Sequence, residues 1–479
     1  MVGKVKIGLE VHVQVTGAKT KLFCNCPVDY RDKAPNTNVC PVCMGFPGAL
    51  PVVNRKAVEL AVTASKSLNC EIPEWLVFTR KHYFYPDLPK NYQITQYKTV
   101  AGAPVCLGGR LDYIDPFDWS IHSVGLDRIN IEEDPGKAVY ERGGIIGSNR
   151  VLIDYNRSGV GLLEIVTRPE LHDARQARIA VENLLLTLWY LGVTDPRLSG
   201  AFRVDANISV EGGDGRVELK NIGSLIEVER GLRYEILRQT KIVEAGGKIA
   251  RETRHWDAVK GVSKATRSKE EETDYMYFPD PDLPPLRVTR SMMVKAEKAL
   301  GFTPLKLWSD MNKYGVDNGL AWSIIRELDL AKTFITAVSI YRNPGLIAWM
   351  LGNVVKGLRE KKGLEYVPLA TDLAYLAELL DKNIVHREIV KYLILPRAME
   401  TGESVKKIME IEGGLPRGEV LERAVEEVLI EESKAVNDLL MGKKQAFNYL
   451  IGRVMRKLGG KGDPREIAEV LRHKLKGLI

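Results

Sequence analysis

The sequence predicts an α+β protein whose strands lie in the N-terminal part and whose helices lie in the C-terminal part. Residues 1–290 contain short runs of alternating apolar and polar residues, separated by Gly, Pro, Asn and Asp, with one clear helical pattern near 176–191. Such alternation is typical of half-buried strands. From residue 291 onward, apolar residues instead recur every three or four positions, for example at 321–332 and 346–361, as in amphipathic helices.

Length and composition predict several domains. A chain of 479 residues is too long for one hydrophobic core. Residues 278–285, Phe-Pro-Asp-Pro-Asp-Leu-Pro-Pro, contain too much proline to continue a strand or a helix. Residues 412–418, Glu-Gly-Gly-Leu-Pro-Arg-Gly, interrupt the helical pattern. We therefore expect domains at 1–290, 291–412 and 413–479.

The charge is concentrated at the C-terminal end. The formal net charge is +7, and residues 441–479 alone hold ten Lys and Arg against three Asp and Glu, so the rest of the chain is balanced. Clustered basic residues suit a polyanion, although a solvated helix surface would look the same.

The sequence gives no sign of a membrane or secreted protein. Hydrophobic residues make up 45% and charged residues 27% of the chain, as in ordinary folded proteins. No apolar run approaches the roughly 20 residues that span a bilayer. The N-terminus leads directly into a strand pattern without a signal peptide. We expect a cytoplasmic protein.

Polar residues share one face of two predicted strands. Residues 5–15 alternate strictly, which puts Glu10, His12 and Gln14 on one side because side chains in a strand repeat every two residues. The run 203–210 alternates in the same way and puts Arg203 and Asp205 together. Each strand by itself could simply present a solvated face.

Further carboxylates follow apolar strands. Glu164 interrupts the continuous apolar run 162–166, and the strand at 128–134 ends with Glu132, Glu133 and an aspartate. A buried carboxylate needs a cation or a hydrogen-bond network. Mg²⁺ would suit such a group of oxygen ligands. Two alternatives remain open: the carboxylates lie on different sides of the sheet, or they pair with Lys81, Arg203 and Lys220.

The cysteines predict a metal site. Four of them form a C-x-C and a C-x₂-C pair separated by thirteen residues, namely Cys24, Cys26, Cys40 and Cys43. Four thiolates at this spacing can surround one tetrahedral Zn²⁺ in a structural role, and disulfides are the competing interpretation. Cys70 and Cys106 belong to no such pattern, so we expect them to be small, unpaired core residues.

Several motifs then resemble a known family. In order along the chain, eight segments match the B subunit family of the three-subunit glutamyl/aspartyl-tRNA amidotransferases: 8–12, 80–87, 131–134, 136–137, 163–166, 203–209, 218–221 and 274–279. Segments 442–447, 450–452 and 454–455 resemble the tail of the same family. Each segment is weak evidence by itself, but the ordered set is specific and covers nearly the whole chain.

The resemblance implies a fold and a reaction. The fold would be a cradle-shaped, kinase-like catalytic domain built on a mostly antiparallel sheet, then a helical domain and a small helical tail that contacts tRNA. The reaction would transfer the γ-phosphoryl group of ATP to the side-chain carboxylate of misacylated Glu-tRNA(Gln) or Asp-tRNA(Asn), after which ammonia displaces phosphate. An acyl phosphate is a good electrophile and a carboxylate is a poor one, so this order is chemically sound.

The resemblance also implies partners. The sequence lacks the Ser- and Gly-rich stretch with a Ser-Ser-Lys triad that an amidase would need to release ammonia from glutamine. Ammonia would therefore come through a channel from the A subunit, an amidase, in a complex with a small C subunit. No segment of the chain can hold the synthetase-like inserted domain of the related two-subunit enzyme, which favours the three-subunit one.

Carried over residue by residue, the resemblance makes His12, Glu133 and Glu164 ligands of one Mg²⁺. Glu10 and Asp205 would hold a second metal ion or orient the water molecules of the first. An imidazole is an unusual ligand for Mg²⁺, so His12 is the assignment that general chemistry supports least.

Further polar residues receive roles from the same resemblance. Lys81 would neutralise phosphate, with Arg203 and Lys220 also at the nucleotide site, and Glu132 could exchange roles with Glu133. Lys220 and Asn221 could line the ammonia channel, although a plain cross-strand pair explains them equally well.

The chain departs from the family pattern at two loops. Met276 stands where Arg is expected, and residues 159–161 read Gly-Val-Gly where Gly-Thr-Pro is expected. Neither change removes a proposed metal ligand. A zinc-bearing, Mg²⁺-dependent nuclease or nucleotidyl transferase would also explain acidic strands and a basic tail. A non-catalytic RNA-binding module with a zinc knob and a basic helical tail is the other alternative.

Overall fold

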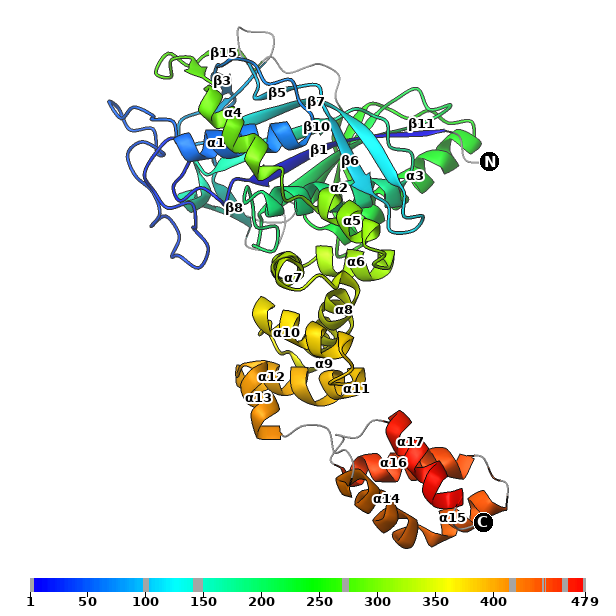
Figure 1. Ribbon diagram of the computed structural model, residues 1–479. Helices are drawn as coiled ribbons and strands as arrows, with labels where there is room; N and C mark the ends of the chain where they lie inside the picture. Colours follow the sequence, from blue (N-terminus) through cyan, green and yellow to red (C-terminus); the bar gives the residue numbers. More distant parts are fainter. Residues whose placement is uncertain are drawn as a thin grey trace. The chain divides into compact units, whose positions relative to one another are not determined.

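The computed structural model describes residues 4–97, 103–140, 150–268, 275–412, 419–441, 443, 445–458 and 464–476. The chain forms two compact units, Met1–Leu307 and Trp308–Ile479. Figure 1 shows the described strands in the first unit and mainly helices in the second. The predicted α+β class is confirmed. The finer division into three domains stays a prediction.

The first unit is organised around a nine-stranded sheet with the order β14-β13-β12-β11-β1-β10-β7-β5, in which β6 also pairs with β7. β1 lies in its interior, between the antiparallel strands β10 and β11. Among the described strands of this sheet, β12 and β13 alone pair in parallel, because helix α3 connects them. The strands are β1 (Val5–Gln14), β5 (Cys106–Leu107), β6 (Arg110–Ile114), β7 (Ile121–Glu133), β10 (Gly161–Thr167), β11 (Phe202–Val210), β12 (Val217–Ile222), β13 (Glu252–Asp257) and β14 (Val262–Ser268).

Helices bury the apolar face of the sheet. α1 (Arg55–Ser67), α2 (Ala174–Tyr190) and α3 (Leu225–Glu244) share one hydrophobic core with the apolar residues of β1 and its neighbours. Each helix begins at a residue whose side chain accepts a backbone N–H bond: Asn54, Asp173 and Ser224. Burial of this apolar face leaves the polar residues of β1 on the opposite side.

Three short sheets complete the described part of the first unit. They are β15-β3-β4, β16-β2 and β8-β9. The proline-rich segment therefore continues the strand pattern, since Phe278 pairs with Arg80 and Leu286 pairs with Leu76. α4 (Arg290–Ala299) follows and packs against α1. The strands are β2 (Trp75–Leu76), β3 (Thr79–His82), β4 (Tyr92–Thr95), β8 (Lys137–Tyr140), β9 (Val151–Asp154), β15 (Phe278–Pro279) and β16 (Leu286–Arg287).

The second unit begins within α5 (Pro304–Lys313) and is helical throughout its described residues. Two short π-helical stretches interrupt it: η2 (Met350–Val355) lies between α8 and α9, and η3 (Val390–Ile394) lies between α11 and α12. The other helices are α6 (Asn318–Ile325), α7 (Leu328–Ile340), α8 (Pro344–Trp349), α9 (Lys356–Lys362), α10 (Ala370–Asp381), α11 (Arg387–Ile389), α12 (Leu395–Thr401) and α13 (Val405–Glu412).

The last four helices form a core of their own. They are α14 (Glu419–Glu431), α15 (Ser433–Leu440), α16 (Gln445–Lys457) and α17 (Pro464–Lys476). Val425, Leu450, Val454 and Leu471 are fully buried in a single cluster. Among the helices that the structure describes, none combines the length and apolar character that crossing a membrane requires.

Candidate active site and cysteine cluster

A polar cavity of about 150 Å³ opens on the charged side of the large sheet. Eight of the residues singled out in the sequence line it: Glu10, His12, Lys81, Glu132, Glu164, Arg203, Asp205 and Lys220. Tyr83, which belongs to the motif at 80–87 but received no role there, completes its wall with Gln93 and Pro135.

Strand register brings these residues together. His12 of β1 lies opposite Glu164 of β10 and Arg203 of β11, and Glu10 lies opposite Asp205. Directly opposed residues of antiparallel strands point to the same side. Glu10, Glu164 and Asp205 therefore share one face, and for these three carboxylates the alternative that they lie on different sides of the sheet is wrong.

Glu10, His12 and Glu164 form the tightest group. One ligand atom from each lies within 4.8 Å of the other two, close enough to hold one ion. His12 Nε2 is 3.2 Å from Glu10 Oε1, and His12 Nδ1 is buried without a hydrogen-bond partner among the described residues. Asn130 donates a 2.6 Å hydrogen bond to Glu164 and so orients that carboxylate.

The negative charge of this group is only partly compensated. Burial, with the nearby charges of Glu132 and Glu10, raises the pKa of Glu164 to about 7. Burial also raises the pKa of Asp205. For Glu10 burial acts in the same direction, but the hydrogen bond and charge of His12 hold its pKa below the ordinary value. A divalent cation among these oxygens would complete the compensation, so the residues fit Mg²⁺.

The cations around the cavity differ in how they are paired. Lys220 Nζ lies 3.3 Å from Glu218 Oε1 and 3.9 Å from Asp205 Oδ2. Arg203 Nη1 lies 3.5 Å from Asp134 Oδ1. Lys81 forms no salt bridge with any residue that the structure describes, so its charge is available to an anion.

The structure separates Glu132 from Glu133. Glu132 lies in the cavity and accepts a 2.8 Å hydrogen bond from Thr95. Glu133 points to the other side of β7, where its carboxylate contacts Lys90 Nζ at 2.6 Å and the Ile94 N–H at 2.9 Å. The predicted ligand Glu133 is therefore not among the residues that line the cavity, and its adjacent Glu132 is.

Strand alternation could have identified one further residue near the cavity, Asn130. Asn130 orients Glu164 and is two positions before Glu132, so strand alternation places both on the same face. Gln93 comes from β4, and its amide donates a 2.8 Å hydrogen bond to the Glu133 carbonyl. Nothing in the local sequence pattern indicated that β4 would lie beside β7.

The four predicted zinc ligands also come together. The four Sγ atoms all lie within 4.8 Å of one another; they belong to Cys24, Cys26, Cys40 and Cys43. Cys40 Sγ and Cys43 Sγ are 3.8 Å apart, which matches the edge of a tetrahedron with metal–sulfur bonds of about 2.3 Å. No disulfide joins these cysteines. They form a candidate metal site in the loop between β1 and α1.

Lys21 supports an anionic cysteine cluster. Its side chain is fully buried, and its Nζ lies 2.7 Å from the Asn38 carbonyl oxygen and 3.7 Å from Cys43 Sγ. It forms no salt bridge with a carboxylate among the described residues. The hydrogen bond from Cys24, together with the charge of Lys21, lowers the pKa of Cys43 to about 5. A buried ammonium group needs an anion nearby, and metal-bound thiolates would supply it.

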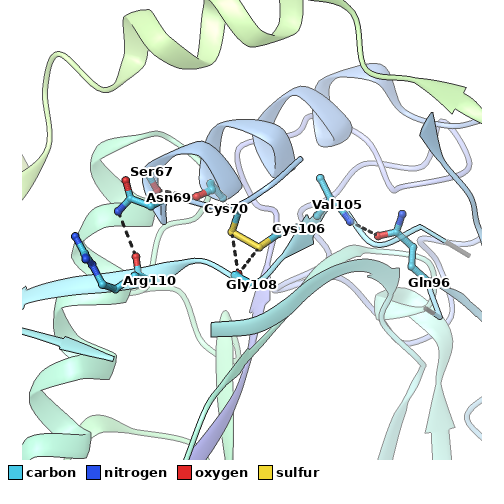
Figure 2. Close-up of a disulfide and its surroundings, with 9 residues drawn as sticks. Ser67, Asn69, Cys70, Gln96, Val105, Cys106, Gly108 and Arg110 are labelled. Carbon is cyan, nitrogen blue, oxygen red and sulfur yellow. Dashed lines mark hydrogen bonds between the residues drawn. A yellow bond between two sulfur atoms is a disulfide. The ribbon is translucent and has the colours of Figure 1, made fainter. Parts of the chain in front are cut away.

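The expectation that Cys70 and Cys106 are unpaired is wrong. Figure 2 shows the disulfide between them, with the sulfur atoms 2.05 Å apart. Cys70 follows α1, Cys106 begins β5, and backbone hydrogen bonds of 2.9 and 3.1 Å between Glu71 and Leu107 hold the two segments side by side. The 36-residue separation hid this pairing, because only the tertiary fold brings the segments together.

Comparisons with known proteins place the chain in a family. Residues 5–294 match the GatB/GatE catalytic domain, and residues 332–475 match the GatB domain. The B subunit of an aspartyl/glutamyl-tRNA(Asn/Gln) amidotransferase from Aeropyrum pernix is 50% identical, over 98% of this chain and 97% of that protein. A protein of the same name from Saccharolobus solfataricus is 43% identical, and the match covers 98% of this chain and 99% of that protein. Another from Methanococcoides burtonii is 38% identical, and the match covers 98% of each chain. The family resemblance of the motifs is confirmed: the chain belongs to the family of B subunits of aspartyl/glutamyl-tRNA amidotransferases.

Proposed function

We propose that this chain uses ATP and Mg²⁺ to phosphorylate the side-chain carboxylate of Glu or Asp on misacylated tRNA. Ammonia then displaces the phosphate and leaves Gln-tRNA(Gln) or Asn-tRNA(Asn). The observation that carries the proposal is the cavity in which carboxylates, His12 and Lys81 meet. The names of the relatives supply the tRNA substrate and the amidation.

Glu10, His12 and Glu164 would hold Mg²⁺, since their ligand atoms already lie together. The bound ion would neutralise charge on the phosphates of ATP. Glu132 would lie next to this ion, and Glu133 would not, because Glu132 lines the cavity.

The cations would position the two anionic reactants. Lys81 lacks a carboxylate partner among the described residues and would bind a phosphate. Arg203 would hold the substrate carboxylate, because guanidinium groups match carboxylates in geometry. Lys220 and Asp205 lie together on the β12 side of the cavity and would line the path by which ammonia arrives.

The reaction needs partner subunits. The relatives are named as B subunits of their enzyme, and we propose that an amidase subunit delivers ammonia while a small third subunit completes the complex. We also propose that the cysteine cluster binds Zn²⁺ as a structural element, since sulfur would fill all four positions.

Glu164→Gln in the assembled complex tests this function. The substitution removes one charge from the cation site at nearly constant shape. We expect transamidation and tRNA-stimulated ATP hydrolysis to fall by about 100-fold or more, as for loss of a group that stabilises charge in the transition state. Affinity for tRNA should stay within about twofold of the wild type.

Glu297→Gln is the matched control, because Glu297 is 57% exposed and, among the described residues, its carboxylate pairs with Lys66 across the α1–α4 contact. It should leave both activities unchanged. The proposal would be contradicted if misacylated tRNA does not stimulate ATP hydrolysis by the wild-type complex. Cleavage of tRNA would instead favour a nuclease.

A further inference from the structure

Five tyrosine rings form a continuous row beside the cavity. Tyr85 is 6.4 Å from Tyr83, Tyr83 is 6.0 Å from Tyr275, and Tyr275 is 6.1 Å from Tyr277, measured between ring centroids. Tyr277 then stacks on Tyr97 at 3.9 Å with an interplanar angle of 7°. We call these five residues the tyrosine row. They come from three segments that are distant in sequence, so tertiary folding assembles the row.

The outer end of the row is open to solvent. Tyr85 is 65% exposed, and the adjacent Phe84 is 76% exposed. Large exposed aromatic side chains that cluster in this way generally mark a binding surface. Core packing does not explain these two rings, because each leaves most of its surface in water.

The row and the cavity are continuous. Tyr83 belongs to both, since it also lines the cavity. Lys81 Nζ, another cavity residue, lies 4.8 Å from the centre of the Tyr275 ring and 5.5 Å from that of Tyr83. A ligand whose reacting end lies in the cavity and whose remainder extends outward would therefore contact the rings.

The size of the cavity limits which part of a substrate enters it. At about 150 Å³ it is smaller than the roughly 300 Å³ at which ligand pockets usually begin. It has room for a carboxylate and a phosphoryl group. Nucleosides attached to either group would extend beyond it, and the surface next to Tyr83 carries the exposed rings of Phe84 and Tyr85.

We propose that Phe84 and the exposed end of the tyrosine row, Tyr85 and Tyr83, stack the bases of the unpaired nucleotides at the 3′ end of the RNA substrate. The inference rests on the proposed function, in which the reacting carboxylate is attached to that end. Single-stranded nucleic acids are commonly bound by bases stacked on aromatic side chains next to basic groups. Lys81 supplies a positive charge beside Tyr83 and Tyr275, where the row meets the cavity.

The row fits an RNA end better than the adenine of ATP. A mononucleotide has one base and needs one or two rings. Here the exposed rings of Phe84 and Tyr85 lie next to Tyr83 at the cavity, and together they offer surfaces for more than one base along a strand.

The test measures RNA binding directly, with the full chain in its assembled complex. The probe is a fluorescent single-stranded RNA hexanucleotide ending in CCA-3′, titrated by anisotropy, with the same sequence in duplex form as a comparison. We expect Tyr85→Ala and Phe84→Ala each to raise the Kd for the single strand by about fivefold or more, the loss expected for one stacked base. Tyr85→Phe keeps the ring and should restore binding.

Tyr392→Ala is the matched control, because Tyr392 is 66% exposed, nearly the same as Tyr85, and lies in the second unit. It should leave the Kd unchanged. An unchanged Kd in Tyr85→Ala and Phe84→Ala would overturn the inference. A higher KM for ATP with normal RNA binding would also overturn it and would assign the row to the adenine of ATP. A failure of complex assembly with normal RNA binding would overturn it as well and would make the row a protein interface.

Amidation of misacylated tRNA by the same variants separates this inference from the proposed function. If the wild-type complex amidates and Tyr85→Ala shows an unchanged KM for tRNA, the inference alone fails. If the wild-type complex does not amidate, the proposed function fails, whatever the hexanucleotide titration gives. A raised KM for tRNA with RNA binding weakened in parallel supports both.

Discussion

Lys21 connects a single residue to the chemistry of the cysteine cluster. Its ammonium group lies 3.7 Å from Cys43 Sγ in a fully buried position. Lys21→Met removes the charge and keeps most of the volume. We expect the affinity for Zn²⁺ to fall by about tenfold or more, as for other groups that contact metal ligands. Competition with a chromogenic chelator measures this affinity.

Lys33→Met provides the comparison, because the Lys33 ammonium contacts the side chain of Asn38 at 3.0 Å in the same loop. That variant should bind Zn²⁺ like the wild type. Equal affinity in both variants would show that the charge of Lys21 does not stabilise the bound metal.

At the residue scale, the sequence identified most of the cavity but left one choice open. Alternation places Glu132 and Glu133 on opposite faces of a strand but does not say which face meets the other carboxylates. The pairing of β7 with β10 decides it, because Asn130 lies opposite Glu164 and Glu132 is in phase with Asn130. That pairing joins segments that are distant in sequence.

At the scale of elements, the Cys70–Cys106 disulfide ties the end of α1 to β5. A cross-link that closes a loop of this length restricts the unfolded chain and should stabilise the first unit by about 4 kcal/mol. We expect Cys106→Ala to lower the free energy of unfolding by about this amount, measured by urea denaturation in the presence of Zn²⁺.

Unfolding in the presence of a thiol reductant provides a control, because the reductant breaks the disulfide. It should destabilise the wild-type protein to about the same extent and should have no further effect on Cys106→Ala. If the reductant lowers the stability of both proteins equally, the disulfide is not the source of the difference.

Periodicity located helices better than it located their ends. The helical pattern at 321–332 predicts one helix, but α6 ends at Ile325 and α7 begins at Leu328. The apolar spacing continues across the turn, and no Gly or Pro marks it. The break is instead accompanied by long-range contacts, since Arg359 binds Glu327 at 2.7 Å and also pairs with Asp329.

At the scale of the whole molecule, the last four helices can be removed as a unit. They have their own hydrophobic core, and the end of the chain carries the excess basic charge. We expect removal of residues 413–479 to weaken tRNA binding and to reduce its dependence on salt, because fewer phosphate contacts release fewer counterions. Binding isotherms at several salt concentrations measure both effects.

The melting transition of the first unit serves as the control, since its core includes no residue of these helices. It should be unchanged in the shortened chain. An unaltered salt dependence would show that the basic end does not contact the phosphate backbone.

The sequence alone determined the features that depend on local periodicity and spacing. Alternation gave the strands of the first unit and the shared face of Glu10 and His12, helical spacing gave the second unit, and the cysteine pattern gave the candidate metal site. The ordered motifs gave the family. Each of these follows from residues that are close in the chain, where backbone geometry fixes which side chains are neighbours.

The tertiary structure decided what depends on contacts between distant segments. Strand register brought Glu164 and Asp205 to Glu10 and His12, β4 held Glu133 away from the cavity, and the fold joined Cys70 to Cys106. It also assembled the tyrosine row. Register and long-range packing depend on the whole hydrophobic core, so no local pattern in the sequence specifies them.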